Sequence, residues 1–481
     1  MDIQDVNVAT TLHLCGMLVI LYLFKLIELE ARRHPQPRAA PADVLPPPPA
    51  DVLAPAPARA ADVPVAPPPL PPGEPVDQQP ARRRRRREGP RRQRTVWVRP
   101  WVGRREQLGF YDCLLRELEA EDRAAYRQFM RMTPELFNLI EARVAPHIQK
   151  SDTNFRRAIE PGLKLAATLH YLATGNTFRS IAFTFRLPHN TISTFLPDVI
   201  DAIITEFSDE IKLPDTPDRW MDVSNEFERQ WNFPHCIGAL DGKHIAIRKP
   251  SGTGTIYYNY KKYFSIVLLA LVDANYLFRY IDVGASGAGS DAGIFNNCEL
   301  KEMIEGAELQ LPPATPLVQG ERHVPFFIVG DEAFALKTWL MKPIPLRQQT
   351  RRQRIYNYRI SRARRVVENA FGILAARFRI FFTAIPLPPE RVQKLVVACC
   401  CLHNLFRRQQ GRVNGAALVD REDENGRLVE GQWRQQQQRH FDDIQRLNYG
   451  RQLEEAKTLR DYLVDYVNSP EGSVAWQENM V

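Results

Sequence analysis

The stretch Cys236–Ile247 places the strongest constraint on how this chain can fold, because the hydrophobic pattern changes there from helical to strand-like. Its apolar residues lead to one carboxylate, Asp241, which is followed by Gly242. An Asp-Gly pair between alternating apolar residues is also typical of a tight hairpin turn, and the stretch alone favours that interpretation. We therefore expect the strand to end at Asp241 and to turn at Gly242, and residues further along must show whether Asp241 has a second role.

Three later segments also have strand character. Phe264–Val272 is a nearly continuous apolar run, as in a strand buried on both faces. Leu277–Val283 is separated from it by a connection of hairpin size, so the two are predicted to pair. Phe326–Gly330 is another short apolar strand, and it ends at Asp331. The sequence thus predicts strands in which a second acid follows the last one directly.

Helical spacing returns after Asp331. We expect a short helix through Leu336 and Trp339, a basic loop over 346–358 and a longer helix over 361–378. On this last helix the apolar residues form one stripe, and Glu368 lies on its flank, roughly 100° from the centre. A carboxylate in that position can lean over the edge of a sheet.

Asp241, Asp331 and Glu368 can meet if neighbouring strand ends and a covering helix bring them together. Hard divalent cations prefer oxygen ligands, so the set predicts Mg²⁺ or Mn²⁺ rather than Zn²⁺. Two such ions about 4 Å apart can activate a water or a 3′-hydroxyl and stabilise the leaving oxygen at phosphorus. Each acid also has a structural explanation: a hairpin turn for Asp241, a helix N-cap for Asp331, and an i, i+4 ion pair with Arg364 for Glu368.

A helical region precedes the strands. Thr133-Pro134 predicts a helix start, and Gly175 a helix end after 161–173. Residues 177–196 then give a short helix, a turn at Leu187-Pro188 and a second helix, which is the layout of a DNA-binding helix-turn-helix. An ordinary helical hairpin explains the same pattern. The polar residues presented by the second helix are His189, Asn190, Thr191 and Ser193.

The first part of the chain differs in composition. Residues 6–24 are uncharged and mostly apolar, which leaves open a membrane anchor or a helix that packs on a partner. Residues 34–80 are rich in Pro and Ala and are expected to be disordered. Six consecutive arginines follow at Arg82–Arg87, typical of a nuclear-import or nucleic-acid-binding tract. They concentrate the net charge of +8 and favour DNA as a partner.

Three motifs resemble one known family. Gly238–His244, Asp331–Phe334 and Arg364–Gly372, in this order, are similar to motifs of the PIF/Harbinger transposases and the nucleases derived from them. The resemblance covers residues 97–406 and implies an RNase H-like core whose DDE triad falls on Asp241, Asp331 and Glu368. It also implies a helical DNA-binding region in front of that core, and often a Myb-like partner protein.

Two departures from the family pattern affect the second acid. Asp331 is followed by Glu-Ala-Phe where many members have Ser-Gly-Tyr, and its separation from Glu368 is short. Asp273 and Asp291 therefore remain alternatives for the second position.

The sequence predicts an α/β protein, which we expect to be a nuclear, divalent-metal-dependent DNA endonuclease or transposase. The alternatives are a catalytically inactive, domesticated DNA- or chromatin-binding protein and a membrane-tethered protein with a retired core, and a homo-oligomer is left open. The basic residues expected to contact DNA are Arg179, Arg186, Lys261, Lys262, Arg362 and Arg365. The expected parts are an apolar helix (1–33), a disordered linker with the Arg tract (34–96), the helix-turn-helix region (97–230), the nuclease domain (231–406) and a polar tail (407–481).

Overall fold

The computed structural model describes residues 98–154, 157–289, 291–345, 347, 349–410, 419–423, 427–435, 441–443 and 454–481. All of them belong to the unit Arg92–Val481. The predicted apolar helix, the Pro-rich linker and the Arg82–Arg87 tract lie outside the described residues. Within the described part of the chain, no helix has the length and apolarity needed to cross a membrane.

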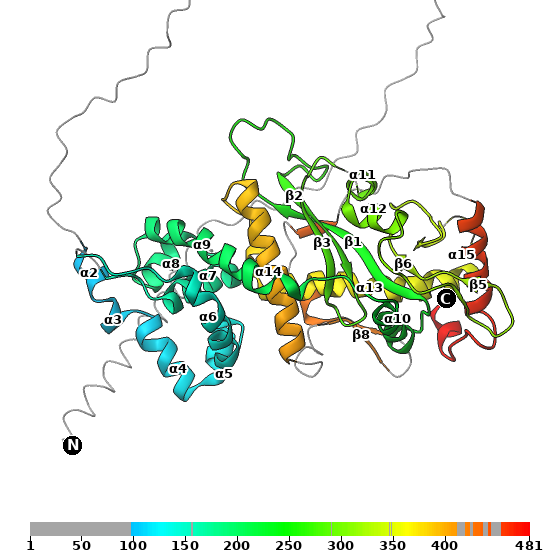
Figure 1. Ribbon diagram of the computed structural model, residues 1–481, viewed down its shortest axis with the longest axis horizontal. Coiled ribbons are helices and arrows are strands. Elements are labelled where there is room, and N and C mark those ends of the chain that lie inside the picture. Colours follow the sequence, from blue (N-terminus) through cyan, green and yellow to red (C-terminus); the bar gives the residue numbers. More distant parts are fainter. Residues whose placement is uncertain are drawn as a thin grey trace, which may run out of the picture. The chain divides into compact units, whose positions relative to one another are not determined.

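The described residues before Asn232 are mainly helical (Figure 1). The predicted caps are in place. The Thr133 hydroxyl accepts a hydrogen bond from the Leu136 N–H at the start of α6, and Gly175, with a φ of 68°, ends α7. The helices of this region are α2 (Pro100–Gly103), α3 (Arg105–Leu108), η1 (Tyr111–Leu115), α4 (Arg116–Glu121), α5 (Arg123–Met130), α6 (Pro134–Ile148), α7 (Pro161–Thr174), α8 (Phe178–Thr184), α9 (His189–Phe207), η2 (Ser208–Glu210) and α10 (Pro217–Trp231).

A mixed sheet follows, so the predicted α/β class is confirmed. Its strand order is β3-β2-β1-β6-β7, and β10 also pairs with β1. β2 is antiparallel to both of its neighbours, β1 and β3, whereas β6 is parallel to β1 and β7 is parallel to β6. The strands are β1 (Cys236–Ala246), β2 (Ser265–Val272), β3 (Phe278–Ser286), β6 (Phe327–Val329), β7 (Leu340–Met341) and β10 (Phe441–Asp443); β4 (Thr315–Pro316) pairs with β5 (His323–Val324), and β8 (Arg421–Glu422) with β9 (Leu428–Val429).

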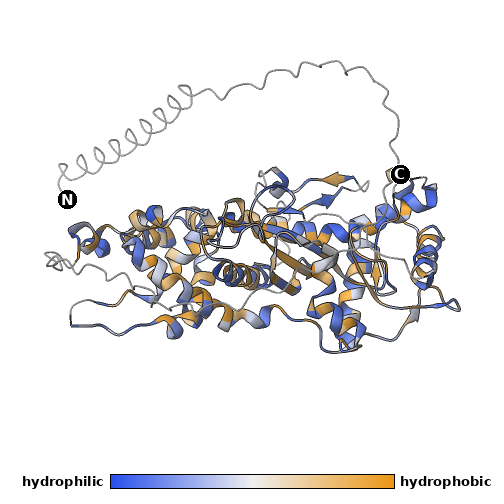
Figure 2. Ribbon diagram, turned by 90° about the horizontal axis from the view of Figure 1, so that it is seen from above, coloured by the Kyte–Doolittle hydropathy of each residue, from blue (hydrophilic) through white to orange (hydrophobic). Residues whose placement is uncertain are grey.

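Both faces of the sheet are buried. Alternate residues of β2 enter two different hydrophobic clusters: Leu268 and Ala270 pack in the cluster that contains α13 (Arg351–Arg377) and α14 (Pro389–Gln410), and Leu269 packs in the other. The second cluster includes residues of α11 (Asp291–Asn296) and α12 (Glu299–Glu305). Figure 2 shows apolar strands in the interior and helices with one hydrophilic and one hydrophobic side.

Several predicted boundaries are wrong. β1 continues through Asp241 and Gly242, so no turn occurs there. No helix forms through Leu336 and Trp339, where the chain turns into β7 instead. The expected loop over 346–358 becomes helix from Arg351, because Thr350 and Gln353 form a reciprocal capping box.

The segment predicted as a polar tail is partly integrated into the fold. β10 completes the edge of β1, and α15 (Glu454–Val467) contacts α13. The C-terminal η6 (Gln477–Met480) also contacts α13, as does η5 (Gln432–Gln435), while η3 (Arg379–Phe382) follows α13 directly.

Candidate active site

Asp241 occupies a break in the pairing along one side of β1. The parallel strand β6 pairs with β1 as far as Ala239, and the antiparallel strand β10 joins only at Lys243. Asp241 therefore lies where one neighbour has ended and the next has not yet begun. It is 5% exposed and is paired on the other side with Ala270 of β2.

Asp331 is delivered to the same region by β6. Val329 is the last β6 residue paired with β1, opposite Ala239, and Asp331 follows two positions later. Its carboxylate is 5% exposed and accepts a hydrogen bond from the Ala333 N–H (2.8 Å), which shapes the turn after the strand. The expected strand-end position of this acid is therefore confirmed, although the helix it was predicted to cap is absent.

Glu368 comes from α13, which contacts β1. Its carboxylate lies 3.8 Å from Arg364, the i, i+4 partner considered from the sequence, and 3.6 Å from Arg434. Arg434 also binds Asp420 in a bidentate pair, with three N–O distances between 2.6 and 2.9 Å. Glu368 is thus held between two arginines, one of which comes from the C-terminal region.

The three acids share one electrostatic neighbourhood. Burial raises the pKa of Asp241, the charges of Lys243 and Arg364 lower it, and the charges of Asp331 and Glu368 raise it further. Lys243 itself is buried and forms an ion pair with Asp443 of β10. Among the described residues, no group of three or more His, Cys, Asp or Glu side chains is arranged to hold a metal ion. The charges of the three acids therefore act on one another, but in this conformation their carboxylates are not arranged around a common metal position.

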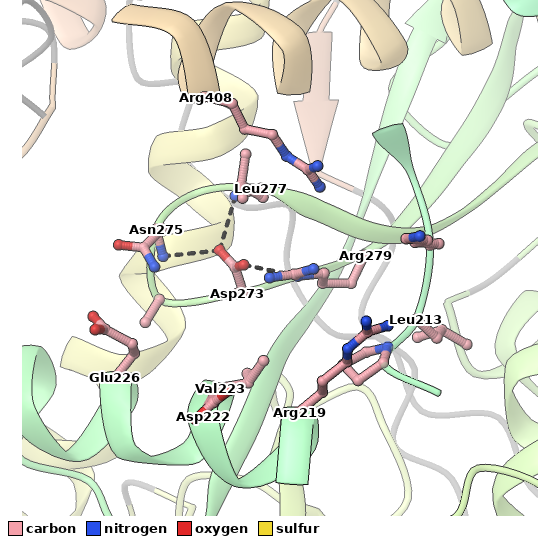
Figure 3. A pocket seen from close by; sticks show the side chains of 13 residues that line it. Leu213, Arg219, Asp222, Val223, Glu226, Asp273, Asn275, Leu277, Arg279 and Arg408 are labelled. Carbon is pink, nitrogen blue, oxygen red and sulfur yellow. Dashed lines mark hydrogen bonds and ion pairs between the residues drawn. The ribbon is translucent and has the colours of Figure 1, made fainter. Parts of the chain in front are cut away.

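Asp273, one alternative for the second acid, follows β2 on the side of β1 opposite to β6, near the beginning of β1. It follows β2, which runs antiparallel to β1, and lines a pocket of about 420 Å³ (Figure 3). Its carboxylate accepts hydrogen bonds from the Asn275 and Leu277 N–H groups and pairs with Arg279 at 2.8 Å. Asp273 therefore stabilises the hairpin between β2 and β3. The aspartate whose charge raises the pKa of Asp241 is Asp331. The other alternative, Asp291, begins α11.

The residues predicted to contact DNA in the helical region belong to α8, to the turn after it and to the first residues of α9. Arg179, His189 and Asn190 are exposed, and Thr191 and Ser193 are half-buried. Arg186 is different, because its guanidinium donates hydrogen bonds to the Leu108 and Trp101 carbonyls (2.9 and 3.0 Å) and ties α8 to the first helices. In this conformation Arg186 therefore stabilises the packing of the helical region.

A cavity of about 380 Å³ lies beside α9 and contains basic residues that sequence reasoning missed. Lys150 and Arg157 come from the loop before α7, and Lys164 comes from α7 itself. The cavity wall is completed by Asn190 and Thr191 at the start of α9. These basic residues precede the predicted helix-turn-helix in the sequence, and that clustering could have indicated them as further DNA contacts.

The remaining predicted DNA contacts separate into two pairs. Arg362 is 4% exposed, pairs with Glu422 at 2.7 Å and lies over the Trp476 ring, and Arg365 pairs with the same Glu422. Both arginines therefore hold C-terminal residues against α13. Lys261 and Lys262, by contrast, are exposed in the loop between β1 and β2.

Comparison with known proteins identifies the domain that contains these acids. Residues 240–404 match the family described as DDE superfamily endonuclease. This segment of the chain is a DDE superfamily endonuclease domain. It contains Asp241, Asp331 and Glu368, and the match confirms the family resemblance predicted from the sequence.

Relatives of the endonuclease domain occur in animals and plants. A Homo sapiens protein named "Putative nuclease HARBI1" is 24% identical over 273 residues, which are 56% of this chain and 72% of that protein. An Arabidopsis thaliana protein named "Protein ALP1-like" is 24% identical over 318 residues, 63% of this chain and 75% of that protein. No solved structure matches the chain.

Proposed function

We propose that this protein is a divalent-metal-dependent DNA endonuclease of the transposase type, which cleaves phosphodiester bonds. One observation carries the proposal. Two buried carboxylates, Asp241 and Asp331, each follow the segment over which the parallel strands β1 and β6 pair. The charge of Glu368 on α13 acts on Asp241, as does that of Asp331. The order β3-β2-β1-β6-β7, with three antiparallel strands followed by two parallel ones, supports an RNase H-like core.

The donor set fits Mg²⁺ or Mn²⁺. All three acids offer carboxylate oxygens, which hard cations prefer, and burial of Asp241 beside two other acids leaves negative charge that a divalent cation would compensate. Asp241 and Asp331 would hold the metal, and Glu368 would complete the site. Bound metal would supply the activated water and stabilise the leaving oxygen at phosphorus.

Glu368 must change partners before it can bind a metal. Its ion pairs with Arg364 and Arg434 must be exchanged before it can serve as a metal ligand. Arg434 has an alternative partner in Asp420, whose side chain is fully buried, so it remains satisfied when Glu368 leaves.

The α8–α9 pair is proposed as a helix-turn-helix that holds DNA. Four residues separate α8 from α9, and the side chains of Arg179 near the start of α8 and of His189 and Asn190 at the start of α9 are exposed. Such a turn lets the first residues of the second helix reach base edges in the major groove.

The test is cleavage of supercoiled DNA in Mg²⁺ or Mn²⁺. Asp241→Asn and Asp331→Asn should each lower the rate by at least about 100-fold, because metal charge stabilisation contributes several kcal/mol. Asp222→Asn is the matched control, since this exposed acid lies on α10 beside the pocket of Figure 3, and its rate should not change. Cleavage by Asp241→Asn at the wild-type rate would overturn the proposal.

A second candidate function is DNA or chromatin binding without catalysis. The pairing of Glu368 with two arginines, together with the lack of a closed metal site among the described residues, favours it. Tight duplex binding by the wild-type protein, with no nicking in either metal, would select this candidate.

Nuclear residence, a Myb-like partner protein and homo-oligomerisation are also proposed on the basis of the family resemblance and the Arg82–Arg87 tract. Membrane tethering through residues 6–24 is the competing proposal. Imaging of a fluorescent fusion with and without residues 1–33 separates them, because only a tethered protein changes from membrane to nucleus on deletion.

A further inference from the structure

The loop between β1 and β2, residues 247–264, combines exposed aromatic rings with positive charge. It contains four basic residues, Arg248, Lys249, Lys261 and Lys262, and no acidic residue. Tyr258 and Tyr260 are 39% and 44% exposed. These two rings are among the large side chains that the described part of the chain exposes, and cations lie beside them in the sequence, which is a combination found at binding surfaces.

The loop is held rigidly at its base. Asn259 is 3% exposed; its side-chain amide donates to the Ser265 hydroxyl (3.0 Å), and its side-chain oxygen accepts from the Tyr263 N–H (3.2 Å). The Ser265 N–H in turn donates to the Tyr257 carbonyl. The backbone that carries the rings on either side of Asn259 is therefore held in place, which lowers the entropy cost of ordering the loop on a ligand.

The loop is physically connected to the candidate active site. The Tyr260 hydroxyl donates to the main-chain carbonyl of Asp443 (3.0 Å), and the carboxylate of Asp443 pairs with Lys243. The charge of Lys243 is one of the two that lower the pKa of Asp241. A DNA strand whose scissile phosphate lies at Asp241 thus has this loop at its flank.

The charge of the loop indicates the class of partner. Arg248 and Lys262 are exposed and form no ion pair with any described residue, which leaves them available for phosphates. Aromatic rings interleaved with cations are the arrangement by which proteins bind unpaired nucleotides, because every base can stack on a ring while the cations follow the backbone.

We propose that Tyr258 and Tyr260 form a stacking platform for unpaired bases of the DNA strand next to the cleavage site. The substrate of the proposed nuclease would then be DNA that is single-stranded or opened beside the scissile bond. This inference rests on the proposed DNA substrate, but it does not require that cleavage occurs.

The experiment measures binding of the full-length protein to a fluorescein-labelled single strand and to the matching duplex by fluorescence anisotropy, with EDTA present to prevent cleavage. Tyr258→Ala/Tyr260→Ala should weaken single-strand binding by between about 5-fold and 150-fold for each base that loses its ring, and should leave duplex binding unchanged. Tyr258→Phe/Tyr260→Phe keeps both rings and should bind like the wild type.

Three outcomes would overturn the inference: equal loss of single-strand and duplex binding in the alanine variant, no loss of either, or no single-strand binding by the wild type. A circular dichroism melt of the alanine variant shows whether equal loss comes from unfolding, in which case single substitutions of Tyr258 and Tyr260 repeat the test. Cleavage is measured separately. A wild type that fails to nick DNA while the alanine variant selectively loses single-strand binding contradicts the nuclease proposal and supports this one.

Discussion

At the scale of single residues, Gly372 shows how closely the C-terminal region packs on the endonuclease domain. A Cβ at this position would overlap the Trp433 ring, whose N–H donates to Asn369 at 2.9 Å. Asn369 also accepts a hydrogen bond from the Asp420 N–H. The absence of a side chain at Gly372 therefore allows residues 419–423 and 427–435 to pack on α13 and Arg434 to lie beside Glu368.

Gly372→Ala should consequently lower the free energy of unfolding by about 1–3 kcal/mol, the usual cost of overpacking a well-packed site. Urea unfolding followed by circular dichroism measures this cost. Gly103→Ala is the control, because a Cβ there meets no atom within 4 Å and alanine favours a helix. Equal stability of the Gly372→Ala variant and the wild type would show that Trp433 moves away at no cost.

At the scale of elements, the sequence predicted helix ends correctly where all the residues of a cap lie close together in the chain. Thr133 and Gly175 marked helix ends correctly, because a cap depends on residues a few positions away. The same kind of signal could have found the start of α13, since Thr350 and Gln353 have capping-box spacing, but the basic residues that follow were interpreted as a loop.

The strand β1 is longer than predicted, for a different reason. Asp241-Gly242 has the composition of a turn, yet β1 continues to Ala246, where β2 pairs along its whole second half and β10 joins from the C-terminal region. No pattern near Asp241 reveals a partner contributed by residues 441–443. The position of Asp331 after a strand and that of Glu368 on a helix were predictable from local patterns. The ion pairs of Lys243 with Asp443 and of Arg434 with Glu368 were not, because these partners are distant in sequence.

The helical region should lose stability in acid through His170 of α7. This side chain is 6% exposed, stacks on Phe129 and packs edge-on against Phe185, and its Nδ1 has no hydrogen-bond partner among the described residues. Burial lowers the pKa of His170 to about 4, below the ordinary value of about 6.5. The folded state therefore favours the neutral ring, so the stability present above about pH 6.5 is lost as the pH falls towards 4.

His170→Phe should remove this part of the pH dependence. Over that range the wild type should lose about 3 kcal/mol more than the variant, from the size of the shift in pKa. Urea unfolding at neutral and acidic pH measures the difference between the two proteins, which cancels the contributions of His244 and His403, whose pKa values are also lowered by burial. Parallel pH profiles for the two proteins would contradict the assignment to His170.

At the scale of the whole molecule, the endonuclease domain needs the residues that follow it. Phe441 of β10 is buried against Phe371 and Phe381, so β10 covers both the edge of β1 and part of the core. Arg359 of α13 is 1% exposed and donates a hydrogen bond to the Gln477 side chain (2.8 Å). The family match ends at residue 404, before any of these C-terminal contacts.

A chain that ends at Gln410 should therefore fail to fold. It would remove the partners of Arg359 and Arg362 in Gln477 and Glu422, uncover the apolar surface on which Phe441 packs, and expose the β1 edge at Lys243–Ile245 to aggregation. Loss of the cooperative thermal transition and recovery in the insoluble fraction measure the effect. Deletion of Met1–Arg91 is the matched control, since all described residues belong to Arg92–Val481, and its melting temperature should equal that of the full chain. A soluble chain ending at Gln410 with a sharp transition would show that residues 240–404 fold without their C-terminal cover.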